Sequence, residues 1–122
     1  MRVVITGASG FIGKPLTESL SGLGHDVLAI ARKIPKSSNS TKIFWLEADL
    51  SSSSTYKNSI KEFYPEVIIH LAWQDIPDFS LKKSQLNLNQ SKELLSFIAS
   101  IKSCKKLLIP GMGSFWEISL IG

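Results

Sequence analysis

Short runs of apolar, β-branched residues alternate along the chain with longer segments in which apolar residues recur at helical spacing. The runs predict buried strands over residues 3–5, 27–31, 43–46, 67–72 and 107–109. The first helical segment is followed by Gly24, which we expect to cap its C-terminal end. Its predicted apolar stripe consists of Ile12, Leu16, Leu20 and Leu23.

Two further helices are predicted between the later strands. One begins at an N-cap within the serine cluster of residues 51–54 and stops before Pro65, and the other spans residues 82–102. Parallel strands need crossover connections, which the intervening helices supply. The alternation therefore predicts an α/β fold, with about five parallel strands and helices on both faces of the sheet.

Composition narrows the class of protein without changing this picture. The 122 residues suffice for one domain, and 43% hydrophobic with 20% charged residues is typical of a globular chain. The net charge of +4 is modest and its basic residues are scattered, which gives little support to nucleic-acid binding.

The single cysteine, Cys104, cannot form an internal disulfide, and we interpret it as a buried thiol. The apolar runs are too short to span a bilayer, and residues 1–7 do not resemble a signal peptide. These features together predict a cytoplasmic location. No metal site is predicted.

A glycine-rich segment joins the first strand to the first helix, over residues 6–13. Gly7 suits the sharp turn, Gly10 lets the backbone approach a pyrophosphate, and Gly13 allows the helix to pack closely on the strand. The free N–H groups and positive dipole end of the helix would face the phosphates. The segment therefore predicts a dinucleotide site on a Rossmann-type, doubly wound sheet.

The spacing of these glycines resembles that of the extended short-chain dehydrogenases/reductases, the NAD(P)-dependent epimerases and dehydratases that act mostly on nucleotide sugars. The resemblance implies that Ser9, Phe11 and Ile12 also belong to the cofactor site. NAD users of this family place an acid at the end of the second strand, whereas this chain has Ala31 followed by Arg32 and Lys33. Because an arginine can pair with a 2′-phosphate, the departure favours NADP, with NAD as the alternative.

Two later segments match the family in order. Asp49 and Leu50 resemble the pair beside the adenine, where the carboxylate accepts from the exocyclic amine; the alternative is that Asp49 caps the next helix. Leu71 and Ala72 resemble a segment whose backbone lines the cofactor, and Trp73 stands where a small residue is commoner. His70, just before them, is interpreted as a hydrogen-bonded core residue.

Two polar residues complete the match. Asn87 resembles the asparagine that opens the long helix of the family, where it assists the active site or bonds to its local backbone. Ser114 follows the fifth strand as the catalytic serine or threonine does, and would hydrogen-bond the substrate oxygen.

The resemblance covers residues 1–117, predicted to be an incomplete cofactor-binding domain, and residues 118–122 diverge from it. The family uses a tyrosine four residues before a lysine for proton transfer, but the corresponding residues after Tyr56 and Tyr64 are isoleucines.

Two functions therefore stay open. The chain is the N-terminal part of a nucleotide-sugar epimerase, dehydratase or reductase and is not catalytic alone, or it is an NADP-binding sensor or partner subunit. A structural remnant that binds nothing is a third reading. In the family, the helix at 82–102 pairs with the tyrosine helix at a dimer interface, which predicts a homo-oligomer as a possible assembly.

Overall fold

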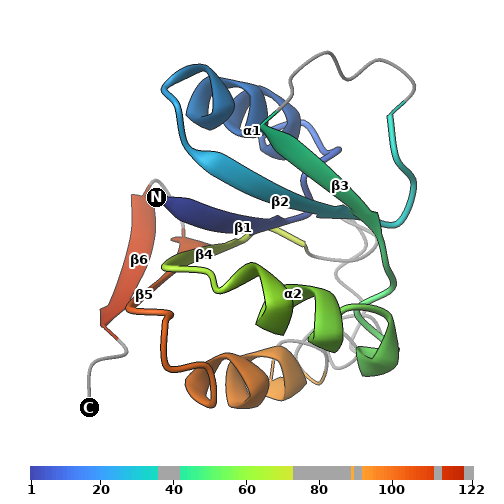
Figure 1. The fold of residues 1–122 in the computed structure, drawn as a ribbon, viewed down its shortest axis with the longest axis vertical. Coiled ribbons are helices and arrows are strands. Elements are labelled where there is room, and N and C mark those ends of the chain that lie inside the picture. Colours follow the sequence, from blue (N-terminus) through green and yellow to red (C-terminus); the bar gives the residue numbers. More distant parts are fainter. Residues whose placement is uncertain (36–41, 73–88, 90–91, 112–113, 120–122) are drawn as a thin grey trace.

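The computed structural model describes residues 1–35, 42–72, 89, 92–111 and 114–119, and for 110, 111 and 114–118 only the backbone is described. The described strands form a single sheet in the order β3-β2-β1-β4-β5-β6 (Figure 1). Neighbouring strands from β3 to β5 are parallel, and β6 is antiparallel to β5. The strands are β1 (Arg2–Thr6), β2 (Asp26–Ala31), β3 (Ile43–Glu47), β4 (Val67–His70), β5 (Lys106–Gly111) and β6 (Ser114–Ser119).

The predicted five-stranded parallel sheet is confirmed, with two differences in detail. β4 ends at His70 instead of Ala72, because its neighbour β1 ends at Thr6, which pairs with His70. β6 was not predicted. Only residues 112–113 separate it from β5, too few for a crossover, so the chain returns antiparallel along the edge of β5.

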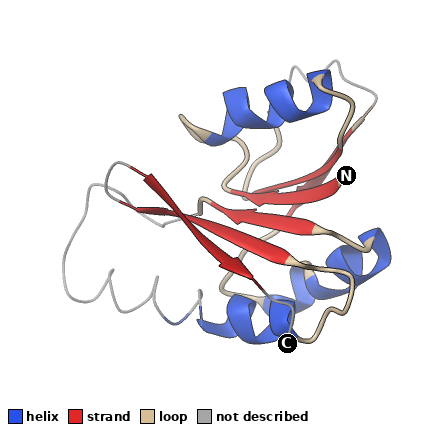
Figure 2. Cartoon of the chain, turned by 90° about the vertical axis from the view of Figure 1, so that its left-hand side faces the viewer, coloured by secondary structure: helices blue, strands red, loops and turns tan. Residues whose placement is uncertain are grey.

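Helices cover both faces of the sheet, as the doubly wound fold requires (Figure 2). α1 (Gly13–Gly22) lies on one face, while η1 (Ser53–Thr55), α2 (Lys57–Phe63) and a helix over residues 92–99 lie on the other. The α1 face packs around Val3, Ile5, Val27, Ala29 and Ile69. The opposite face packs around Val4, Leu28, Ile30, Tyr56, Ile60, Ile68, Leu94, Phe97 and Ile98.

The buried face of α1 is made of small residues, which corrects the predicted apolar stripe. Gly13, Thr17 and Ser21 are buried, whereas Ile12 is 55% exposed and Leu23 is 76% exposed. Leu16 and Leu20 from the stripe are half-buried against the sheet. Residues four apart lie on one side of a helix, so three small side chains in such a row let α1 approach the sheet closely.

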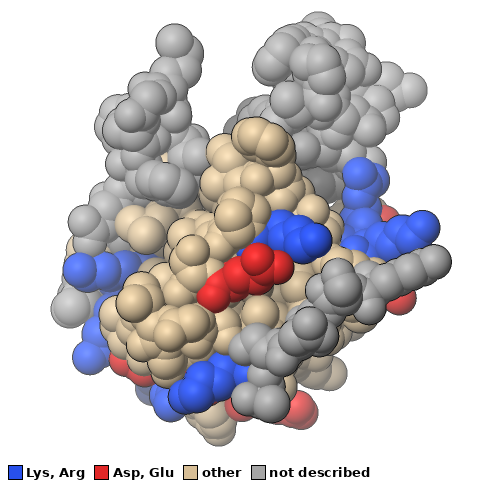
Figure 3. Space-filling model, turned by 90° about the horizontal axis from the view of Figure 1, so that it is seen from above, with Lys and Arg blue, Asp and Glu red and all other residues tan. Residues whose placement is uncertain are grey.

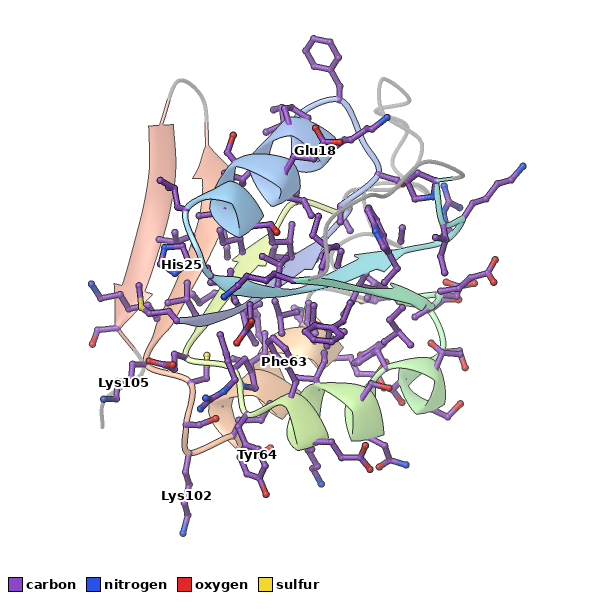
Figure 4. All side chains as sticks on the ribbon, turned by 45° about the horizontal axis from the view of Figure 1, so that its top comes forward. Glu18, His25, Phe63, Tyr64, Lys102 and Lys105 are labelled. Atoms are coloured by element: carbon purple, nitrogen blue, oxygen red, sulfur yellow. The ribbon has the colours of Figure 1, made fainter. Side chains whose placement is uncertain are left out.

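The serine cluster does not cap α2, which corrects a second expectation. α2 begins after Tyr56, and no side chain of the described residues caps it. It ends before Pro65 as predicted, at Tyr64, whose φ of 54° is left-handed. Figure 4 shows Phe63 between α2 and the sheet and Tyr64 on the outer side of the helix end.

Other single-residue expectations can be compared directly. Gly24 follows α1 with a φ of 95°, as expected of a capping glycine. Cys104 is a buried free thiol, and burial raises its pKa. Within the described ranges, no helix combines the length and the apolar character needed to cross a membrane.

Candidate nucleotide site

A cavity of about 370 Å³ opens at the carboxyl edge of the sheet. The β1–α1 turn forms one wall, and the residues that follow β2, β3 and β4 form the others. β1 lies between β2 and β4, so the connections from β1 and β4 leave on opposite faces and open a crevice at this edge. The lining residues are Gly7, Ser9, Gly10, Ile30, Ala31, Arg32, Lys33, Ala48, Asp49, Leu50, Leu71 and Ala72.

The glycine turn is shaped by two positions at which a side chain would not fit. Gly7 has a φ of 67°, and a Cβ there would lie 2.9 Å from the nitrogen of Ala72. A Cβ on Gly13 would overlap the carbonyl oxygen of Gly7 and lie 2.9 Å from Cα of Ala8. The start of α1 therefore packs directly on the turn, and the turn packs on the exit of β4.

Gly10 differs from the other two glycines. Its N–H donates to the Gly7 carbonyl at 3.1 Å, and a Cβ would meet only that carbonyl oxygen, at 3.3 Å. It lines the cavity, so a side chain at this position would occupy space that faces a ligand.

Backbone donors are available at this wall of the cavity. Among the described residues, the N–H groups of Ser9, Phe11 and Ile12 have no acceptor, and no described side chain caps α1. The first N–H groups of a helix lack partners within it and attract anions. The Phe11 side chain in this turn is 98% exposed.

Basic and acidic groups face one another at the far end of the cavity. Arg32 and Lys33 follow β2, and Asp49 follows β3. The ends of these two strands are held together by a hydrogen bond of 2.9 Å from the Ala48 N–H to the Ala31 carbonyl. On the face viewed from above the molecule, acidic and basic side chains of the described residues are interspersed (Figure 3).

The Asp49 carboxylate has a local role as well as a place in the cavity. Its Oδ1 accepts hydrogen bonds from the Ser51 N–H at 2.9 Å and the Ser51 hydroxyl at 2.8 Å. These two bonds, followed by the charge of Arg32, hold the pKa of Asp49 below its ordinary value. The carboxylate is therefore ionised near neutrality and orders the turn after β3. The alternative that Asp49 caps the next helix is wrong, because η1 begins after Ser52 and α2 after Tyr56, and no described side chain caps either of them.

His70 and Thr6 form a buried contact beneath the cavity. The Thr6 hydroxyl lies 2.7 Å from Nδ1 of His70 and accepts from the N–H groups of Leu71 at 3.0 Å and Ala72 at 3.2 Å. Burial lowers the pKa of His70 to about 4. His70 is thus the hydrogen-bonded core residue that was predicted.

The structure brings most of the predicted cofactor residues to one cavity. Phe11, Ile12 and Gly13 belong to the adjoining turn and not to its lining, and Ile30 and Ala48 line it without having been predicted. Both missed residues are apolar and buried, so nothing in their chemistry marked them. Their positions, one residue before the end of β2 and one after β3, were the only available signal.

Three predicted residues cannot be compared at the side-chain level. Trp73 and Asn87 lie outside the described residues, and for Ser114 only the backbone is described. Ser114 pairs with Gly111, which places it at the carboxyl end of β5. In the described part of the predicted dimer helix, the exposed residues are Asn89, Lys92, Glu93, Ser96, Ala99, Ser100 and Lys102. That face is polar or small, and dimerisation through it stays a prediction. The described residues include no group of three or more His, Cys, Asp or Glu side chains that could hold a metal ion.

The fold and the site together define a class of protein, the nucleotide-binding doubly wound α/β domains. The strand order, the glycine turn before α1 and the cavity at the reversal of strand order are its features. Residues 3–113 match the model of the NAD dependent epimerase/dehydratase family, and the chain belongs to this family.

Two curated proteins are similar in sequence to this chain. UDP-glucose 4-epimerase of Mycolicibacterium smegmatis is 36% identical over 91 residues, which cover 69% of this chain and 28% of that protein. Methionine adenosyltransferase 2 subunit beta of Danio rerio is 25% identical over 114 residues, covering 93% of this chain and 31% of that protein.

Solved structures share the fold at lower identity. The Bordetella bronchiseptica enzyme WbmG in complex with NAD superposes with a TM-score of 0.76 at 19% identity, over 89% of this chain and 36% of that one. UDP-glucose 4-epimerase of Thermotoga maritima with UDP-glucose superposes with a TM-score of 0.73 at 20% identity, over 89% of this chain and 37% of that one. The chain thus spans about a third of the length of these relatives.

Proposed function

We propose that this chain binds NADP(H), or NAD(H), in the cavity at the carboxyl edge of the sheet. One observation carries the proposal: at one end the cavity has glycines and the N–H of Ser9, which has no acceptor among the described residues, and at another it has Arg32 with Lys33. Family membership supports it, and structures of the same fold contain NAD.

The residues present fit a dinucleotide in a consistent order. The N–H groups of Ser9, Phe11 and Ile12, in the turn that leads into α1, would hold the pyrophosphate, because they have no acceptor among the described residues. The ends of β2 and β3 would hold the adenosine, with Asp49 and Leu50 beside the adenine. Leu71 and Ala72 would line the path toward the nicotinamide. When bound, the nicotinamide supplies hydride donation or acceptance.

Arg32 supports a preference for NADP(H). It follows the last residue of β2, where the ribose 2′ position of a bound dinucleotide is expected, and Lys33 adds a second positive charge. No acid stands at Ala31 to accept from ribose hydroxyls or to repel a phosphate. A guanidinium can pair with the two oxygens of a phosphate at once.

For the reaction we propose the nucleotide-sugar chemistry of an epimerase, dehydratase or reductase, carried out by a lineage of which this chain supplies the cofactor-binding part. Ser114, at the carboxyl end of β5, would hydrogen-bond a substrate oxygen. No tyrosine in the 122 residues precedes a lysine by four positions, so we expect this chain alone to bind without turnover. The alternative is an NADP-binding sensor or partner subunit, and a cytoplasmic location is part of both proposals.

The test is an equilibrium titration of the purified chain with NADPH and with NADH, followed by nucleotide fluorescence. We expect saturable binding of both nucleotides, with NADPH bound more tightly. Arg32→Asp should weaken NADPH binding by roughly 10- to 100-fold, the equivalent of a charge-assisted bond worth about 1.5–3 kcal/mol, and should change NADH binding by less than about threefold.

Lys102→Asp is the matched control, because it makes the same change of charge at an exposed position. Figure 4 shows Lys102 at the opposite end of the molecule from α1, the helix that carries Glu18. It should leave both affinities unchanged. If neither nucleotide binds saturably, the proposed function is wrong. If both bind and Arg32→Asp weakens them equally, only the preference for NADP(H) is wrong.

A further inference from the structure

The last residues of β1 and β4 contact each other through their side chains. Thr6 and His70 are paired in the register of these strands, and their side chains are 0% and 5% exposed. The distance between the Thr6 hydroxyl oxygen and Nδ1 of His70 is 2.7 Å. Neither side chain lines the cavity, and the proposed cofactor contacts use neither of them.

The hydrogen bonds of the Thr6 hydroxyl determine which atom carries the proton. A hydroxyl has one hydrogen and two acceptor positions. The N–H groups of Leu71 and Ala72 occupy the acceptor positions, so the hydroxyl hydrogen is left for Nδ1 of His70. Nδ1 is therefore the unprotonated nitrogen of a neutral imidazole. The Leu71 N–H also reaches the Thr6 carbonyl at 3.2 Å, while for the Ala72 N–H only the bond to the hydroxyl is seen within the described chain.

The two residues held by this hydroxyl form part of the cavity wall. Leu71 and Ala72 line the cavity together with Gly7. The Ala72 nitrogen lies so close to Gly7 that a Cβ on the glycine would be 2.9 Å from it. A small displacement of this peptide would therefore change both the wall and the glycine turn that it touches.

We propose that His70 is a positioning residue of the dinucleotide site, which acts by taking the Thr6 hydroxyl hydrogen so that the hydroxyl oxygen holds the Leu71–Ala72 backbone against the glycine turn. This inference rests on the proposed function of the cavity. It assigns a binding role to a histidine that does not line the cavity and acts through the Thr6 hydroxyl and the Leu71–Ala72 backbone. It also accounts for a polar pair at the end of two buried strands, since a buried polar group is costly unless its bonds are made.

Four variants separate the hydrogen bond from the volume of the side chains. His70→Asn keeps an acceptor oxygen where Nδ1 stands, and Thr6→Ser keeps the hydroxyl. His70→Leu and Thr6→Val remove one partner each with little change of volume. For each variant the experiment measures the Kd for NADPH and the hydrogen-exchange rates of the Leu71 and Ala72 amides without nucleotide.

We expect His70→Leu and Thr6→Val to weaken NADPH binding by roughly three- to tenfold, the equivalent of losing one neutral hydrogen bond, and to speed exchange at Ala72. His70→Asn and Thr6→Ser should stay within about twofold of the wild type in both measurements. Val3→Ala, buried on β1 away from its cavity end, is the control for lost stability. It should lower stability and leave the Kd unchanged.

The outcomes that overturn the inference are distinct. Unchanged NADPH affinity in His70→Leu removes the positioning role, whatever happens to amide exchange. Equal weakening in His70→Asn and His70→Leu shows that the ring volume matters and not the hydrogen bond. A wild-type chain that binds neither nucleotide refutes the proposed function itself, and is recognised before any variant is compared.

Discussion

At the scale of single residues, burial decides the protonation of His70. Burial lowers its pKa, from an ordinary value near 6.5 to about 4. The hydrogen-bond pattern independently requires an unprotonated Nδ1. Protonation would place a hydrogen between Nδ1 and the Thr6 hydroxyl, whose acceptor positions are already occupied. Protonation of His70 therefore destabilises the folded chain.

The consequence is a pH-dependent stability. Between about pH 6.5 and pH 4 the unfolded chain binds a proton at His70 and the folded chain does not, so the free energy of unfolding falls as the pH falls. The loss across this window should reach about 3 kcal/mol, at about 1.4 kcal/mol for each pH unit between the two pKa values. Urea unfolding at several pH values measures it.

His70→Asn is the reference for that measurement, because it cannot titrate. The difference in the free energy of unfolding between the wild type and His70→Asn should be constant above about pH 7 and should grow as the pH falls below it. The pKa of Asp49 is also lowered, so its contribution to stability is lost only as the pH falls below the ordinary pKa of a carboxyl group. Asp49 is present in both proteins, so its effect cancels in the comparison. Parallel curves for the two proteins from pH 7 to pH 4 would contradict the assignment.

The sequence predicted the chemistry of individual residues better than their exposure. His70 was predicted to be a bonded core residue because a polar side chain within an apolar run must find a partner. Ile12 and Leu23 were placed on a buried stripe, yet they are exposed, because hydrophobicity does not reveal how closely a helix approaches its sheet. The partner of His70, Thr6, lies 64 residues away and carried no signal of its own.

At the scale of elements, the close approach of α1 to the β1 turn shapes the site. The row of Gly13, Thr17 and Ser21 replaces the large apolar residues that usually separate a helix from a sheet. Such a row is recognisable in sequence once the glycine turn fixes where the helix begins. β6 was not recognisable, since its pairing depends on the edge that β5 leaves open and not on a pattern of its own.

Two glycines at opposite ends of α1 test this packing. Gly13→Ala should destabilise the chain by about 2–4 kcal/mol and weaken NADPH binding strongly, because its Cβ meets the backbone of Gly7 and Ala8. A Cβ on Gly22 would have no neighbouring atom within 4 Å, so Gly22→Ala should be neutral or stabilising by up to about 1 kcal/mol. Thermal unfolding of both variants measures the contrast. Equal effects would mean that α1 does not pack on the turn as described.

At the scale of the whole molecule, the topology brings distant segments to one edge. The cavity combines residues that follow four strands, whose carboxyl ends meet at one edge because these strands are parallel. The glycine segment after the first strand made the position of the site predictable from sequence. The substrate side was not predictable, since the chain spans about a third of its relatives and the contacts of Ser114 lie outside the described side chains.

The most direct test of the account is to map where NADPH binds. In a titration followed by backbone amide chemical shifts, the signals of Ser9, Gly10, Arg32 and Ala72 should move along one saturable curve. The amide of Lys105, before β5 at the opposite edge of the sheet, should not move. Saturable shifts centred on residues outside the cavity, or no shifts at millimolar NADPH, would contradict the assignment of this edge as a dinucleotide site.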